Sequence, residues 1–204
     1  MPSQNDSLKD VVSILLYLYG VVMALALTRS IGLIVTPSGI ALSPLQLDAQ
    51  DLAIFGAFFI TIVPFYHGAS VYMLTTYRDH GYSTKKGAPL VDFFTLSLQG
   101  VVFYAMASSI QDLFSFIVWF IVLLLIDLFW YGFTYFKAEG PQKIAPRWWA
   151  ILNLATVLVL TVLSAISAQA FVQVYALLFA VATIRTLLDY YLCYSYYFPA
   201  STKS

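Results

Sequence analysis

Six apolar stretches, each as long as a membrane-crossing helix, constrain this chain more than any other feature. A helix needs roughly 20 apolar residues to cross a hydrocarbon core of ~30 Å. Such stretches run over residues 11–35, 52–74, 90–110, 113–136, 148–168 and 172–194. Stretches such as FIVWFIVLLLI are apolar on every face, whereas strands of a membrane barrel alternate. The sequence therefore predicts an all-α, polytopic membrane protein whose six transmembrane helices form one domain over residues 1–204.

The charge content supports a lipid environment. Hydrophobic residues make up 61% of the 204 residues and charged residues only 10%, whereas soluble domains carry about 25% charged residues. So few charges cannot cover a globule with solvated side chains, so we expect the lipid bilayer as the main partner. The formal net charge is +0, which gives no reason to expect nucleic acid as a partner.

The basic residues outside the six apolar stretches predict the orientation of the helices in the membrane. They are Lys9, Arg78, Lys85, Lys86, Lys137, Lys143, Arg147 and Lys203. The connections 36–51, 109–112 and 169–171 contain no Lys or Arg. Loops rich in Lys and Arg stay on the cytoplasmic side. We therefore expect cytoplasmic N- and C-termini, in the inner membrane of a cell.

Polar residues inside the apolar stretches form a predicted layer in the cytoplasmic half of the bundle. At a rise of 1.5 Å per residue they lie about 8–13 Å from the cytoplasmic helix ends. The candidates for an ion or substrate pathway are His67, Gln99, Asp127, Arg185 and Asp189, and Asn153 lies at a similar depth. Ionisable groups in a membrane core are costly and usually face the bundle interior, where they find partners.

Arg185 has two candidate partners. Asp189 follows it by four residues, so the two side chains share one helical face and can form an intrahelical ion pair. Asp127 lies at the same depth as Arg185 and has no local partner. If Arg185 pairs with Asp189 in its own helix, we expect the pair to have a packing role. If Arg185 instead contacts Asp127 on another helix, we expect a functional cavity between them.

His67 follows Pro64 in IVPFYHGAS. Proline removes one backbone hydrogen bond and bends a helix. The imidazole can then bond a neighbouring carbonyl as a structural group, or it can handle protons or bind a ligand.

Other polar residues have structural interpretations. Arg29 is an outer polar group, expected near Asp51 or Asp112. Asp92 and Asp112 are expected to cap helix N-termini, where carboxylates are favourable. The tyrosines near the end of the sixth stretch are expected at the membrane interface, where tyrosine is enriched. They are Tyr190, Tyr191, Tyr194, Tyr196 and Tyr197.

Motifs for known chemistry are missing from the sequence. We find no GxSxG, HExxH, Walker loop, GxGxxG or EF-hand spacing. The single cysteine, Cys193, excludes an internal disulfide and a CxxC site. We therefore expect no cofactor, no metal and no catalytic residues, and we lean against an enzyme.

Three functions stay open. The first is a channel or transporter for a small ion or solute, able to assemble as a homo-oligomer. The second is a signalling, effector or accessory subunit that contacts a cytoplasmic protein through the loop 75–89. The third is an intramembrane lipid-modifying enzyme with Asp127 and His67 as acid and base.

Overall fold

The computed structural model describes residues 4–35, 48–79, 88–135, 144–167 and 172–198. Within these ranges the chain is all-helical and contains no strand. The helices are α1 (Gln4–Val35), α2 (Ala49–Met73), a π-helix η1 (Leu74–Asp79), α3 (Ala88–Ser108), α4 (Leu113–Tyr135), α5 (Ile144–Ser167), α6 (Val172–Leu192) and α7 (Tyr194–Tyr197).

Six of these helices, α1 to α6, are long and apolar enough to cross a membrane. This confirms the predicted all-α class with six apolar helices, and it indicates an integral membrane protein. Two helix starts have side-chain caps. Asp48 accepts a hydrogen bond from the Gln50 N–H at 2.9 Å, and Asp112 accepts one from the Ser115 N–H at 3.3 Å. Such caps satisfy backbone donors that have no partner within the helix.

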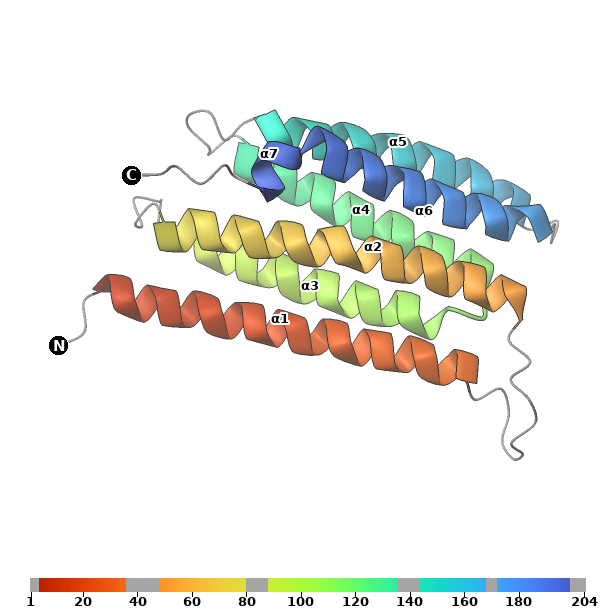
Figure 1. Ribbon diagram of the computed structural model, residues 1–204, viewed down its shortest axis with the longest axis horizontal. Helices are drawn as coiled ribbons and strands as arrows, with labels where there is room; N and C mark the ends of the chain where they lie inside the picture. Colours follow the sequence, from red (N-terminus) through yellow and green to blue (C-terminus); the bar gives the residue numbers. More distant parts are fainter. Residues whose placement is uncertain (1–3, 36–47, 80–87, 136–143, 168–171, 199–204) are drawn as a thin grey trace.

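The six long helices pack as a closed ring (Figure 1). Around the ring, α1 contacts α3, α3 contacts α4, α4 contacts α5, α5 contacts α6, α6 contacts α2, and α2 returns to α1. The start of α1 and the short α7 lie at the same end of the bundle (Figure 1). We call this the basic end, because Arg78 in η1 and Arg147 in α5 also lie there.

Apolar side chains fill the inside of the ring and also cover much of its outside. Phe58, Phe103, Phe116 and Phe120 are fully buried. Large apolar side chains are exposed on each of the six long helices, and Phe129 on α4 is 72% exposed. Soluble monomers rarely expose continuous apolar surfaces. Lipid contact accounts for this outer face.

A glycine brings α1 close to α3 near the polar layer. A Cβ atom added to Gly100 would lie 2.8 Å from Val22 Cγ1. Real Cβ contacts are longer, so only glycine allows this approach of the two helices. The contact lies next to Gln99 in α3 and places Tyr19 of α1 within reach of that amide.

Candidate functional site

A small cavity lies inside the ring of helices and is lined by side chains from α2 to α7. It leaves about 30 Å³ for the centres of water molecules, more than the ~10–15 Å³ that one water needs. Its polar lining comes from Thr95, Gln99, Asp127, Arg185 and Asp189. Trp130, Trp149, Tyr197 and Phe65 supply aromatic walls. The site therefore combines charged groups with an apolar enclosure.

Asp127 lies on α4 and receives two amide hydrogen bonds from neighbouring helices. Gln99 Nε2 on α3 donates to one carboxylate oxygen at 3.3 Å. Asn153 Nδ2 on α5 donates to the other oxygen. Asp127 therefore has its partners on other helices, as its apolar sequence context predicts.

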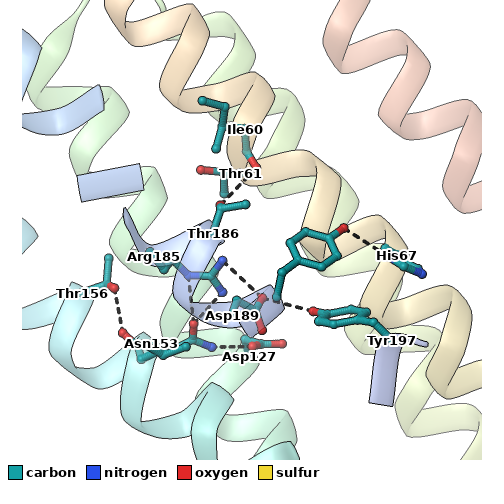
Figure 2. A network of polar contacts seen from close by, with 12 residues as sticks. Ile60, Thr61, His67, Asp127, Asn153, Thr156, Arg185, Thr186, Asp189 and Tyr197 are labelled. Atoms are coloured by element: carbon teal, nitrogen blue, oxygen red, sulfur yellow. Dashed lines mark hydrogen bonds and ion pairs between the residues drawn. The ribbon is translucent and has the colours of Figure 1, made fainter. Parts of the chain in front are cut away.

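Arg185 on α6 contacts both of its predicted partners, one directly and one through a bridge. Its Nη1 atom lies 3.9 Å from Asp189 Oδ2. Its Nη2 and Nε atoms donate to Asn153 Oδ1 at 2.8 and 3.3 Å. Because the Asn153 amide also donates to Asp127, it links the guanidinium to that carboxylate (Figure 2).

The guanidinium is buried but not fully satisfied. Arg185 is only 5% exposed, and its charged carbon lies 4.9 Å from the centre of the Phe65 ring. Its Nη1 atom donates no hydrogen bond to any residue that the structure describes. Buried donors usually have a partner. This atom therefore leaves a hydrogen-bonding position for another molecule in the cavity.

The network continues in both directions from these residues. Tyr197 on α7 donates to Asp189 Oδ2 at 3.1 Å. Tyr19 on α1 approaches Gln99 Oε1 at 3.5 Å, a long hydrogen bond. The chain of contacts thus runs from α1 through α3, α4, α5 and α6 to α7.

His67 has the depth predicted for the polar layer but faces away from this cavity. It is not among the residues described as lining the cavity. Its Nδ1 atom lies 3.1 Å from the Tyr190 hydroxyl, with which it shares a hydrogen bond. Its ring also lies 4.8 Å from that of Tyr197. The rotation of α2 turns His67 toward the tyrosines, so the acid–base pair with Asp127 has no support.

Arg29 is exposed on α1. Within the described ranges it forms no ion pair with Asp51 or Asp112, contrary to its expected partners. Asp112 caps α4, as predicted, and also accepts a hydrogen bond from the Ser115 hydroxyl at 2.5 Å. The Ser115 hydroxyl lowers the pKa of the Asp112 carboxyl, because it stabilises the charged form.

The position of Asp92 corrects the prediction that this residue caps a helix N-terminus. It lies in the second turn of α3, beyond the capping position, and is 2% exposed. It accepts hydrogen bonds from the Tyr72 hydroxyl at 3.3 Å, the Trp130 indole at 2.8 Å and the Tyr77 hydroxyl. This second buried carboxylate ties α3 to α2, η1 and α4 next to the cavity wall.

The tyrosine cluster divides into outer and inner members. Tyr191 is 80% exposed, and Tyr194 is also exposed, as interfacial anchors require. Tyr197 is 4% exposed and points back into the bundle because α7 begins a new helix after Cys193. Burial and the nearby Asp189 raise the pKa of the Tyr197 hydroxyl. This tyrosine therefore stays a neutral hydrogen-bond donor.

Asn153 is the residue of this site that sequence reasoning did not select. The signal that could have identified Asn153 is its depth in the membrane, which matches that of the other polar groups. The described part of the chain contains no cluster of three metal-ligating His, Cys, Asp or Glu side chains. Most of the loop 75–89 that was expected to bind a protein partner, residues 80–87, lies outside the described residues.

No protein-family model, no curated protein and no solved structure matches this chain.

Proposed function

We propose that this protein is a channel or transporter for a small ion or solute, with a pathway through the central cavity. The observation that carries the proposal is the Arg185 guanidinium, which is 5% exposed and whose Nη1 atom donates no hydrogen bond to any residue that the structure describes. Charged groups inside a membrane protein usually mark substrate or ion pathways. A purely structural arginine would have its donors occupied by the protein.

The composition of the cavity supports the same proposal. Gln99, Asp127, Arg185 and Asp189 come from three different helices and meet around a space that accommodates water. A small shift of one of these helices relative to its neighbours would change the hydrogen bonds that join Gln99, Asp127, Asn153 and Arg185. This sensitivity is suited to a site that binds and releases an ion.

We further propose that the chain acts as a single six-helix domain with both termini in the cytoplasm of its cell and its basic end toward the cytoplasmic side of the inner membrane. The start of α1 and helix α7 lie at this end (Figure 1). Basic residues favour the cytoplasmic side. The cavity then lies in the cytoplasmic half of the membrane.

The test is a flux measurement on purified protein in liposomes. Protons, monovalent cations and small anions are each followed by a specific dye or electrode. We expect flux of at least one species, and a loss of about tenfold or more in Asp127→Asn. A hydrogen bond to a charged group contributes about 1.5–3 kcal/mol, and 1.4 kcal/mol corresponds to tenfold.

The matched control is Asp112→Asn. It makes the same chemical change at a carboxylate outside the cavity, and asparagine also caps helices well. We expect its flux to equal that of the unaltered protein. Equal flux in Asp127→Asn for every species, or flux no greater than in protein-free liposomes, would contradict the proposal.

A further inference from the structure

The charges around the cavity do not balance. Asp127 and Asp189 face one guanidinium, that of Arg185. If both carboxylates are ionised, the cavity carries one excess negative charge in a region where unpaired charge is costly. A single added positive charge restores neutrality. The cavity leaves only about 30 Å³ for the centres of water molecules, so that charge must be very small.

Asp189 is the carboxylate in direct contact with the guanidinium, through Oδ2, whereas its Oδ1 atom accepts no hydrogen bond from any residue that the structure describes. It forms the direct ion pair with Arg185, at 3.9 Å. It also accepts a hydrogen bond from the Tyr197 hydroxyl at 3.1 Å. Charge and hydrogen bonds of this kind stabilise a carboxylate.

Asp127 forms no direct ion pair with a cation among the described residues. Its hydrogen-bond donors are two neutral amides, those of Gln99 and Asn153. Asn153 stands between Asp127 and the Arg185 guanidinium, because the guanidinium donates to Asn153 Oδ1. The added positive charge therefore belongs on Asp127.

Gln99 can adapt to a protonated Asp127. A half-turn of its side-chain amide presents Oε1 to the new O–H group and turns Nε2 toward Tyr19. The Tyr19 hydroxyl now donates to Gln99 and can accept instead, since a phenol does both. Asn153 cannot turn in this way, because its oxygen already accepts from Arg185. The arm of the network through Gln99 and Tyr19 is therefore reversible, because its hydrogen bonds can change direction. The arm through Asn153 is fixed.

Among the described residues around Asp127, the other carboxylate of the cavity is Asp189, which already contacts the guanidinium. The polar or titratable neighbours in the network come from α1, α3, α5, α6 and α7. They are Tyr19, Gln99, Asn153, Arg185, Asp189 and Tyr197. On α2, Phe65 faces the guanidinium, and His67 faces Tyr190 and Tyr197.

We propose that Asp127 is a proton-binding site in the cavity, and that passage through the cavity depends on this proton. The carboxylate takes the proton from cavity water and returns it to water, with no other bond made or broken. The dependence of passage rests on the proposed transport function, whereas the proton site itself does not.

The experiment is infrared spectroscopy of the full-length protein in liposomes across a pH titration. A protonated carboxyl group has a C=O stretch distinct from that of a carboxylate. We expect a carboxyl band to appear as the pH is lowered and to be absent in Asp127→Asn. Asp92→Asn makes the same change at the other buried carboxylate and should keep the band.

Two further variants keep Asp127 and shift the midpoint of its protonation in opposite directions. Asp189→Asn leaves Arg185 with Asp127 as its remaining counter-ion, so the midpoint should fall by about 1–3 pH units. Arg185→Gln removes the cation, so the midpoint should rise. The same titrating band in Asp127→Asn as in the unaltered protein, or a midpoint unchanged in Asp189→Asn, would overturn the proposal.

Flux measured on the same samples separates the two proposals. If the band behaves as expected and no species crosses the liposome membrane, transport fails and the proton site stands. If flux is present but independent of pH, and Asp127→Asn removes no titrating band, transport stands and the proton site fails.

Discussion

Asn153 links the two halves of the polar network at the centre of the bundle. Its oxygen accepts from Arg185, and its nitrogen donates to Asp127 (Figure 2). It is 1% exposed, so water cannot replace these bonds without reorganisation of the helices. A neutral amide between opposite charges keeps them associated while it holds them apart. This separation leaves Asp127 free to respond to the contents of the cavity.

Asn153→Leu should therefore destabilise the protein. The change keeps the side-chain volume similar but leaves Asp127 without one donor and Arg185 without one acceptor. Each buried group left unpaired costs about 1–3 kcal/mol. Thermal unfolding in detergent should show a lower midpoint temperature. Gln173→Leu makes the same amide-to-alkyl change at an exposed position of α6 and should unfold near the temperature of the unaltered protein. An unchanged midpoint temperature of unfolding in Asn153→Leu would contradict the bridging role of Asn153.

At the scale of elements, close approach of α1 and α3 completes the network. Gly100 lets Val22 approach, and the hydroxyl of Tyr19, one helical turn away on α1, then approaches Gln99. Without this contact the reversible arm of the network would end at Gln99. The position of α1 is thus coupled to the polar layer, although α1 does not line the cavity.

Gly100→Ala should push α1 away from α3, because its Cβ would lie 2.8 Å from Val22 Cγ1. Overpacking of this kind costs about 1–3 kcal/mol. Val22→Ala in the same chain removes the clash and should restore most of the stability, measured as thermal unfolding in detergent. Gly32→Ala is the control, since its added Cβ meets no atom within 4 Å. A double variant no more stable than Gly100→Ala would show that Val22 is not the obstacle.

At the scale of the whole molecule, the sequence predicts the helices well because membrane thickness sets their length. Stretches of apolar residues and the polar segments between them are local features, and they locate α1 to α6. Depth along each helix is local too, which is why Gln99, Asp127, Arg185 and Asp189 were selected together. All four line the same cavity.

The local sequence does not determine how each helix is rotated about its axis. The differences between the predicted and the observed partners follow from this. His67 has the right depth but faces Tyr190. Asp92 lies near a helix start but points into the bundle, where it meets Trp130. Helices that are apolar on every side carry no strong signal for the face that they turn inward. Such partners require the packed structure.

The proposed pathway requires that water and small ions enter the polar cavity from the basic end, which faces the cytoplasm in the proposed orientation. Thr95 lines this cavity on α3, whereas Leu98 on the same helix is exposed on the outer face. Each is replaced by cysteine in a Cys193→Ser background. Silver ion, a small thiol-reactive cation, is then added to one side of membrane vesicles, and the remaining free thiols are counted with a maleimide dye after denaturation.

We predict that silver added from the cytoplasmic side blocks Thr95→Cys and leaves Leu98→Cys free, while silver from the opposite side blocks neither. A Thr95→Cys thiol that stays free from both sides, or that reacts no faster than Leu98→Cys, would contradict the account.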